Sequence, residues 1–445
     1  MLQIYDVETA RAGILNRDDA LDVGVPEGLQ RGIEAMFGER LTPEQVVRRI
    51  LADVRKRGDT AVREWTARID GVELESILLN PETITAGAKR IEQAEPELYS
   101  ALKKAADRIR LFHQCQPLPN WTTDKLGGTL GQRATPIARV GVYVPGGTAP
   151  LPSSLLMSVI PAQVAGVSEI VVATPPGKSG GAVPDVILAA AHIVGVDNIV
   201  TLGGAQAIGA LAFGTDSLRR VDKIVGAGNL FVTLAKREVY GRVGIDGLYG
   251  PTETVVVADD TAVPAWVAAD LLAQAEHDVL ATAILITPSR VLAEAVQVEI
   301  GRQLETLSRP EIITQSLAGQ GGIVLTASVA EACALASEFA AEHTCIATEN
   351  PAQYQDLIPN AGGLFIGERS FEVLGDYVAG PSHVMPTSGT ARFASPLNVL
   401  DFVKISSLIA LDDETTAVLA PLAARIAQAE ALTAHANAAQ KRVEI

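Results

Sequence analysis

The chain has 445 residues, of which 48% are hydrophobic and 20% are charged. This composition is ample for packed cores and excludes an intrinsically disordered protein, and the length predicts about three domains, or two with appendages. A formal net charge of −16 argues against nucleic acid and anionic membrane surfaces as partners, because both would repel the chain.

The N-terminal forty residues are expected to be irregular and to contain an arm. They begin with MLQIYDVETARAG, which lacks the basic and apolar segments of a signal peptide. The first clear helix follows Thr42, which can act as its N-cap, with Pro43 in the first helical position and Gln45 completing a capping box. Gly58 is placed to end this helix, and helical patterning resumes over residues 84–112.

Strands and helices alternate from Arg139 onward. Strands are predicted at residues 140–144, 170–173, 198–202 and 222–225, each followed by a helix, the last of which begins at Leu230. Short, Gly-rich connections between such elements are typical of a parallel sheet in a doubly wound α/β domain.

A second alternation follows, with strands predicted at residues 254–258, 283–287, 322–326 and 344–347. Helices are predicted at residues 264–277 and 289–307 and in a segment that ends at Ala341. The tail from Asp412 is Ala-rich and predicted to be helical, with Pro421 as a kink or boundary. We therefore expect two α/β units that separate near Gly250 and Pro251.

The cysteines and the hydropathy pattern bear on the compartment. Cys115, Cys333 and Cys345 form an odd, sparse set without Cys-x-x-Cys spacing, which argues against a disulfide framework and a thiolate zinc site. No apolar run approaches the roughly 18 residues that a membrane span requires. We therefore expect a protein of the reducing cytoplasm, without a membrane partner.

Two of the six histidines, His113 and His192, lie in predicted helices, where a structural or surface role is the simpler interpretation. Gln274 and His277 lie three residues apart on a predicted helix, so their side chains share a face and can reach one point. Helical metal sites built from carboxylates use this spacing, and here Gln274 would take the place of the carboxylate as the oxygen donor. Polar residues at this spacing also occur by chance on many helices.

Glu342 and His343 stand where a long predicted helix gives way to a strand. Such a pair can present two acid–base groups to one cleft, or it can be an ordinary solvated pair. Asp376 and His383 lie in a Gly-punctuated stretch and are either metal ligands or surface residues.

The C-terminal helix carries Glu430 and, five residues later, His435. At roughly 100° per residue the two side chains lie about 140° apart, so they would approach a shared site from different sides.

The usual nucleotide-binding fingerprints are absent. No G-x-G-x-x-G opens either α/β unit, and Gly177-Lys178-Ser179 fails as a P-loop because Val172 stands where the first glycine is required. Three polar, Gly-rich loops do follow predicted strands: residues 143–147, 203–206 and 226–229. Ligands of open parallel sheets bind beyond the carboxyl ends of strands, so these loops indicate a nucleotide site, although tight βα turns also explain them.

Taken together, these segments resemble the histidinol dehydrogenase family over nearly the whole chain, from the helix at Thr42 to His435. The matching stretches, in order, are RVGVYVPGGTAPLPSSLLM, TLGGAQAIGALAFGT, VDKIVGAGN, GIDGLYGPTE, DLLAQAEHD, AAEH, NAGGLFIG, GDYVAGPSHVMPT and AEALTAHANA. Their order and spacing make chance similarity implausible.

The resemblance implies a homodimer of α/β subunits with active sites shared between them. Each subunit would have two incomplete Rossmann-like parallel-sheet domains with smaller N- and C-terminal segments that reach the other subunit. The domains expected are an N-terminal arm (1–35), an α/β domain with the zinc and acid–base residues (36–122 with 252–397), an NAD-binding domain (123–251) and a C-terminal helical tail (398–445).

The resemblance also implies roles for individual residues. One zinc ion per subunit would be bound by Gln274, His277, Asp376 and His435, the last donated by the other subunit. Glu342 and His343 match the catalytic acid–base pair, and Tyr143, Gln206 and Asn229 match the NAD contacts. Thr252, His383 and Glu430 match substrate contacts, to which the zinc ligands and His343 are added. Thr252 replaces a more usual Ser, and its hydroxyl can make the same contact.

The reaction implied is the oxidation of L-histidinol through L-histidinaldehyde to L-histidine by two NAD molecules, with zinc as a template for the substrate. His343 would take the alcohol proton, for which a near-neutral pKa is suited, and Glu342 would activate the water that attacks the aldehyde.

Two other interpretations compete. A related zinc- and NAD-dependent enzyme could oxidise another hydroxylated molecule, such as a sulfopropanediol, but the presence of His383, Glu430 and His435 argues against it. A non-catalytic zinc-binding or assembly protein is disfavoured because Glu342 and His343 are both intact.

Overall fold

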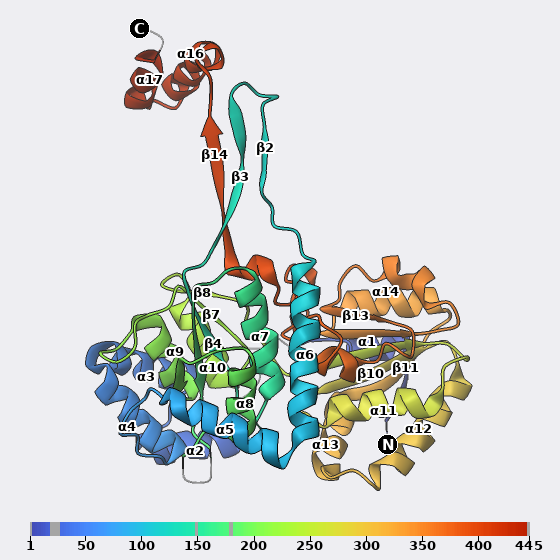
Figure 1. Cartoon of the computed structure of the whole chain (residues 1–445). Helices are drawn as coiled ribbons and strands as arrows, with labels where there is room; N and C mark the ends of the chain where they lie inside the picture. Colours follow the sequence, from blue (N-terminus) through green and yellow to red (C-terminus); the bar gives the residue numbers. More distant parts are fainter. Residues whose placement is uncertain (1, 18–26, 147–149, 178–180, 443–445) are drawn as a thin grey trace.

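The computed structural model describes residues 2–17, 27–146, 150–177 and 181–442. They form two α/β lobes side by side and a slender arm that carries the C-terminal helices away from the body (Figure 1). Helix α6 (Pro96–Gln114) stands between the lobes in this view. The predicted fold class, an α/β chain with two parallel sheets, is confirmed.

The first lobe is built on five parallel strands in the order β6-β5-β4-β7-β8. Their bounds are β4 (Arg139–Tyr143), β5 (Glu169–Thr174), β6 (Ile199–Thr201), β7 (Lys223–Val225) and β8 (Gly244–Ile245). Side chains alternate between the faces, so Val142 packs with α7 (Pro152–Val164) and α8 (Asp185–Ile193). Tyr143 packs instead with α9 (Gly204–Phe213) and α10 (Leu230–Val239) on the other face.

The N-terminal helices complete the first lobe rather than the second. They are α2 (Glu27–Phe37), α3 (Pro43–Arg57), α4 (Asp59–Asp70), α5 (Pro81–Ala94) and α6. Helix α3 begins with the predicted capping box of Thr42 and Gln45, and Val54 on its apolar face packs in the core that contains α9 and α10. The assignment of residues 36–122 to the domain of residues 252–397 is therefore wrong, because their buried apolar faces belong to the cores of the first lobe.

The second lobe contains six parallel strands in the order β1-β11-β10-β9-β12-β13. Their bounds are β1 (Ile4–Asp6), β9 (Glu253–Ala258), β10 (Thr282–Thr287), β11 (Gly321–Leu325), β12 (His343–Ala347) and β13 (Gly363–Ile366). Helices α11 (Pro264–Ala275), α12 (Arg290–Leu304) and α13 (Pro310–Gln320) pack on one face, with α1 (Val7–Ala12) and α14 (Val329–Phe339) on the other. Both faces are covered, so the central strands are continuous runs of buried residues.

Shorter elements complete this lobe and its connection to the arm: η1 (Pro351–Leu357), α15 (Glu372–Tyr377), η2 (Thr390–Arg392) and η3 (Val399–Phe402). The expected N-terminal arm is corrected in its described part, since β1 pairs in parallel with β11 and so makes this segment the edge of the sheet. Residues 1 and 18–26 of that predicted arm lie outside the described residues.

The arm is a three-stranded antiparallel sheet in the order β14-β3-β2, with two helices at its tip (Figure 1). The strands are β2 (Trp121–Thr123), β3 (Thr129–Pro136) and β14 (Val403–Ala410), and the helices are α16 (Asp413–Ala429) and α17 (Thr433–Gln440). The predicted helical tail is thus correct for α16 and α17 but not for β14, which pairs with β3 over its full length. None of the described helices is long and apolar enough to cross a lipid bilayer.

Candidate functional site

The predicted acid–base residues meet at one edge of the second sheet. Strands β9 and β12 are neighbours, with His343 opposite Thr254 in the parallel register. Thr252 and Glu342, which come just before these strands, therefore lie together at the amino edge of the sheet. Because β9 and β12 pair although they are distant in sequence, Glu342 and His343 lie next to Thr252 and Glu253.

Glu342 is buried, and two donors hold its carboxylate. The Thr252 hydroxyl donates to its Oε2 at 2.5 Å, and the backbone N–H of Glu253 donates to the same oxygen at 3.2 Å. Gln274 in turn donates its Nε2 to the Thr252 hydroxyl oxygen at 2.7 Å. Burial raises the pKa of Glu342 to about 7, so its carboxyl group can accept and return a proton near neutral pH.

His343 is buried among acidic side chains. Its Nδ1 lies 3.2 Å from the carbonyl oxygen of Glu253, which orients Nδ1–H toward that acceptor and leaves Nε2 as the free ring nitrogen, 3.6 Å from Asp376 Oδ1. Burial lowers the pKa of His343, but the nearby carboxylates of Glu372 and Glu342 raise it by more. The pKa of His343 is therefore about 10. The near-neutral pKa expected for this residue is therefore not found in the chain alone.

Two functional candidates escaped the sequence reasoning. Glu372 is buried at the start of α15, accepts a hydrogen bond from the Thr254 hydroxyl and lies 3.9 Å from His343 Nδ1. Burial raises the pKa of Glu372 to about 7. Glu372 lies four residues before Asp376 in the same helix, and this spacing in the sequence could have indicated that the two carboxylates share a face. The second candidate, Glu253, contacts Glu342 and His343 through its backbone N–H and carbonyl groups. Every residue type can make such contacts, so the sequence does not indicate them.

The predicted metal ligands of the body gather beside this pair. Gln274 lies in the last turn of α11, and its Oε1 is buried without a hydrogen-bond partner in the described chain, as a free oxygen donor should be. Burial lowers the pKa of His277, and the Asp376 carboxylate opposes that shift. Within the described residues, no group of three or more His, Cys, Asp and Glu side chains could hold a metal ion. Two of the four predicted ligands cannot contribute to such a group: Gln274 has an amide side chain, and one histidine lies far along the chain, on the arm.

That second ligand is His435. It is exposed on α17, one of the two helices at the tip of the arm (Figure 1). Glu430, which follows the end of α16, is also exposed. The structure of one chain therefore does not bring either residue to Glu342 and His343.

His383 links the two lobes. Its Nδ1 lies 2.8 Å from the Asp376 carbonyl oxygen, and its Nε2 lies 3.2 Å from the Ser154 hydroxyl in the first turn of α7. Burial lowers the pKa of His383. A side chain predicted to contact substrate thus lies at the junction between the acid–base cluster and the first lobe.

The predicted nucleotide residues lie at the carboxyl edge of the first sheet. Tyr143 ends β4, and its hydroxyl oxygen accepts from the Gly204 backbone N–H at 3.2 Å. Gln206 is fully buried in the first turn of α9, and its Nε2 donates to Asp70 at 3.2 Å. Asn229 caps α10 by accepting from the Val232 N–H. Tyr143 is the last residue of β4, and the other two residues follow β6 and β7, so all three share one edge of the sheet. Gly147, in the loop after Tyr143, lies outside the described residues.

The remaining predictions concern residues away from these groups. Lys178 and Ser179 of the rejected P-loop lie outside the described residues. His113 is buried and pairs with Gln116 at 3.1 Å, whereas His192 is exposed, so both fit the structural or surface interpretation.

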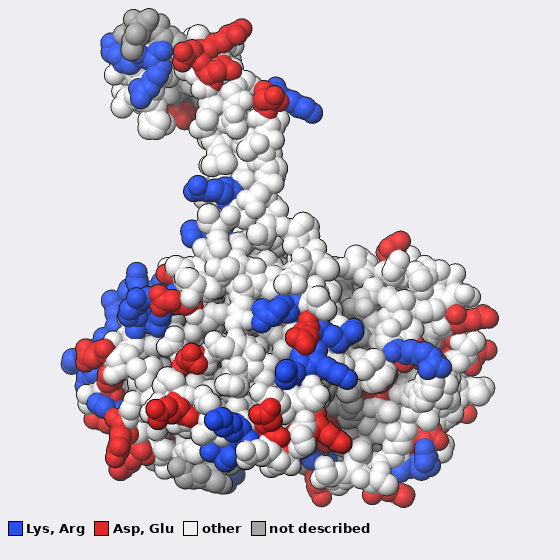
Figure 2. All heavy atoms as spheres, viewed as in Figure 1, with Lys and Arg blue, Asp and Glu red and all other residues white. Residues whose placement is uncertain are grey.

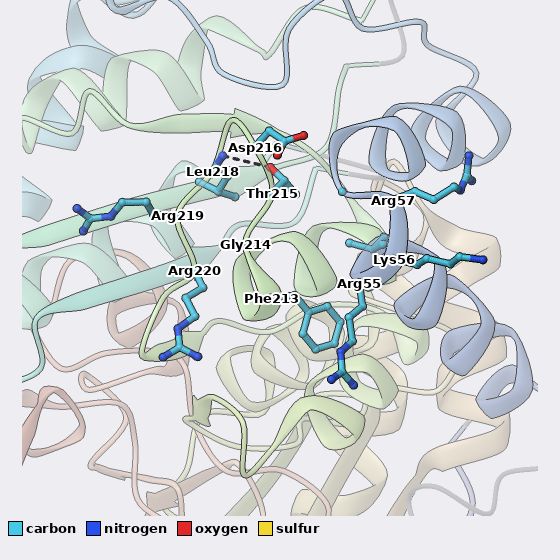
Figure 3. A pocket seen from close by; sticks show the side chains of 12 residues that line it. Arg55, Lys56, Arg57, Phe213, Gly214, Thr215, Asp216, Leu218, Arg219 and Arg220 are labelled. Carbon is cyan, nitrogen blue, oxygen red and sulfur yellow. Dashed lines mark hydrogen bonds between the residues drawn. The ribbon is translucent and has the colours of Figure 1, made fainter.

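An open hollow of about 500 Å³ lies elsewhere, between the end of α3 and the loop that leads into β7 (Figure 3). Its lining includes Arg55, Phe213 and Arg220, and none of the predicted site residues. It lies at the amino edge of the first sheet, opposite the edge that carries Tyr143, and we assign no chemistry to it.

The chain is similar to known proteins over its full length. The family model described as histidinol dehydrogenase matches residues 39–443. A histidinol dehydrogenase of Deinococcus radiodurans is 50% identical and one of Ralstonia nicotianae is 45% identical, with coverage of 100% of both chains in the first case and 97% and 98% in the second. A crystal structure of histidinol dehydrogenase from Elizabethkingia anophelis superimposes with a TM-score of 0.90 at 33% identity, covering 100% of this chain and 98% of that one. The chain belongs to the histidinol dehydrogenase family, a family of NAD-dependent oxidoreductases.

Proposed function

We propose that this chain oxidises L-histidinol through L-histidinaldehyde to L-histidine, with two molecules of NAD, in the cytoplasm. The observation that supports it best is the buried pairing of Glu342 and His343 with Thr252, Gln274 and Asp376 around them. This arrangement combines two proton acceptors with oxygen and nitrogen donors that suit a divalent metal.

The proposed zinc ligands are Gln274, His277 and Asp376 of one chain and His435 of the partner subunit. The buried, unpartnered Oε1 of Gln274 and the proximity of the Asp376 carboxylate to imidazole groups support this set. Zinc bound there would hold the imidazole and amine of the substrate and offset the carboxylates that raise the pKa of His343.

In the first oxidation, His343 takes the hydroxyl proton on Nε2, the nitrogen that is free of protein hydrogen bonds, as hydride passes from the alcohol carbon to NAD. In the second, Glu342 takes a proton from the water that adds to the aldehyde, and the hydrate gives its hydride to a second NAD. Thr252 holds Glu342 in place for this step. Tyr143, Gln206 and Asn229 are the proposed NAD contacts, and His383 and Glu430 are proposed to bind the substrate.

A homodimer with shared sites is supported by the arm. Apolar side chains on its strands, its tip helices and the connections between them are exposed to solvent in the single chain: Trp121, Leu126, Ile405, Ile409, Val418, Leu419, Leu422, Ile426 and Leu432. The stem of the arm also shows few charged side chains on the face seen in Figure 2. An exposed apolar surface of this kind is typical of a subunit interface, and a second copy of this chain is the proposed occupant.

The decisive measurement is the number of NADH molecules formed per L-histidinol consumed with excess NAD, before and after chelation. The proposal requires two NADH, loss of activity on chelation, and recovery with zinc. A Glu342→Ala variant should lose the second oxidation more than the first and release L-histidinaldehyde. Absence of NADH from histidinol, in a protein that binds zinc and NAD, would reject the proposal.

A further inference from the structure

Arg17, which follows α1, reaches the amino edge of the second sheet from outside the predicted site. Its guanidinium group forms an ion pair with Glu253, and the side chains of the two residues are only 18% and 8% exposed. The guanidinium carbon lies 3.7 Å from the centroid of the Phe339 ring, so the group is stacked as well as paired. Arg17 is thus fixed by two different contacts to two different elements of the second lobe.

Its partner Glu253 holds both members of the acid–base pair through its backbone. The N–H of Glu253 donates to Glu342 Oε2 at 3.2 Å. The carbonyl oxygen of the same residue lies 3.2 Å from His343 Nδ1, and this contact determines which ring nitrogen is left free. A shift of this one peptide segment would therefore displace the carboxylate and the imidazole together.

The Glu253 carboxylate is buried, and in the described chain Arg17 is its only ion-pair partner. A buried carboxylate that loses its cation must find water or another donor, and side chain and backbone rearrange to allow it. The residue begins β9, so the rearrangement would occur at the strand end that carries the catalytic contacts. The pair is therefore coupled to the geometry of the site and not only to the stability of the lobe.

We propose that Arg17 is a positioning residue for the reaction: by clamping Glu253, it keeps the backbone of that residue where it orients Glu342 and His343. This inference rests on the proposed function. Because displacements of about 1 Å reduce rates by roughly 100-fold, the loss of Arg17 should reduce kcat while leaving the binding groups on the other elements in place.

The experiment compares Arg17→Met with Arg11→Met in the full-length enzyme. Arg11 lies on the same N-terminal segment and pairs with Glu338 at the exposed surface, so its loss is the matched control. We expect Arg17→Met to lower kcat about 10- to 100-fold, with KM for histidinol and NAD changed less than about threefold. Arg11→Met should retain wild-type values. A kcat within about twofold of the control, or a loss expressed only in KM, would overturn the proposal.

Arg17→Lys covers the case in which Arg17→Met does not fold. It keeps the charge but not the planar, stacked fork, so its kcat should fall between those of wild type and Arg17→Met. A wild-type kcat in Arg17→Lys overturns the proposal.

A second readout needs no substrate. The rate at which His343 reacts with diethyl pyrocarbonate, followed by peptide mass spectrometry, should increase in Arg17→Met or Arg17→Lys and not in Arg11→Met. If wild type forms no NADH from histidinol, the proposed function fails, and this rate still decides whether Arg17 positions the imidazole. An unchanged rate means that it does not.

Discussion

Lys236 and Asp246 form an ion pair whose side chains are only 2% and 1% exposed, and together they hold both sides of one glycine. Asp246 accepts from the Gly226 N–H at 2.6 Å, while Lys236 donates to the Gly226 carbonyl at 2.8 Å. Gly226 has φ +112°, and a Cβ there would lie 2.2 Å from the Tyr143 carbonyl oxygen, so only glycine fits. The pair thus fixes the start of the loop that carries Asn229.

Asp246→Asn should weaken NAD binding more than histidinol binding. The substitution leaves Lys236 buried without its counter-charge, a change that typically costs about 3–5 kcal/mol of unfolding free energy. Denaturant titration and the KM for each substrate measure the two effects. Asp185→Asn, which removes an exposed pair with Arg90, is the control and should change neither. An unchanged NAD affinity in Asp246→Asn would mean that the loop does not depend on the pair.

Thr252→Ser should keep the wild-type kcat/KM, whereas Thr252→Val should lower it. The hydroxyl accepts from Gln274 and donates to Glu342, and serine can do both. Valine removes both hydrogen bonds, each worth about 1–3 kcal/mol when the partners are buried or charged, so kcat/KM should fall by at least about tenfold. Steady-state kinetics of the two variants test this expectation, which fails if valine is tolerated as well as serine.

Gln274→Leu should weaken zinc binding by at least about tenfold, because it removes the buried amide oxygen that has no protein partner. Competition with a chromophoric chelator measures the affinity without any assay of the reaction. His192→Asn, at an exposed histidine, should bind zinc as the wild type does. Equal affinity in both variants would exclude Gln274 from the site.

A mixture of His343→Ala and His435→Ala subunits tests whether the site is shared. Each variant alone should be inactive. If His435 is donated to the other chain, the mixed dimer contains one intact site, and random exchange of subunits should restore about a quarter of the wild-type activity. A ligand donated within the same chain would give no recovery, since neither subunit would then hold a complete site.

Asp270→Asn should stabilise the protein at alkaline pH. Burial, with a contribution from Glu368, raises the pKa of Asp270 from 3.8 to about 7. The folded state therefore binds the proton more tightly than the unfolded state, and stability falls as the pH rises from about 4 to 7. The variant should gain little in Tm at pH 4 and most at pH 8. Asp356→Asn, at an exposed aspartate, should show no such trend.

Much of the fold follows from local pattern. The capping box at Thr42, the buried β-branched runs of β9 and β10 and the Gly-rich turns of the first sheet each have a short-range physical cause, and their predicted bounds lie within a few residues of the structure. An amphipathic helix reveals that one face is buried but not against which sheet. The pattern therefore predicts α3 to α6 as helices but does not predict that they pack in the cores of the first lobe.

The site shows the same limit. Glu342 and His343 are adjacent in sequence and could be paired there, whereas Glu372 and Arg17 reach His343 and Glu253 only through the parallel pairing of distant strands. The sequence predicts no strand at β14, whose apolar residues, such as Ile405 and Ile409, are exposed in the single chain and join no core of the described residues. The contacts of Glu253 with Glu342 and His343 are made by backbone atoms, which every residue has, so they cannot be predicted from the type of side chain.

The tip of the arm has almost no interior of its own: the buried apolar side chains of its two described helices are all alanines, Ala420, Ala424, Ala427 and Ala436. Such a small cluster cannot hold two helices in place, so their persistence would depend on what the apolar stem and tip contact. With His435 donated to a second chain, docking of the tip and completion of the metal site would be one event. Dilution would then inactivate the enzyme while both lobes stay folded, and backbone amides of α16 and α17 would exchange faster at low protein concentration than at high.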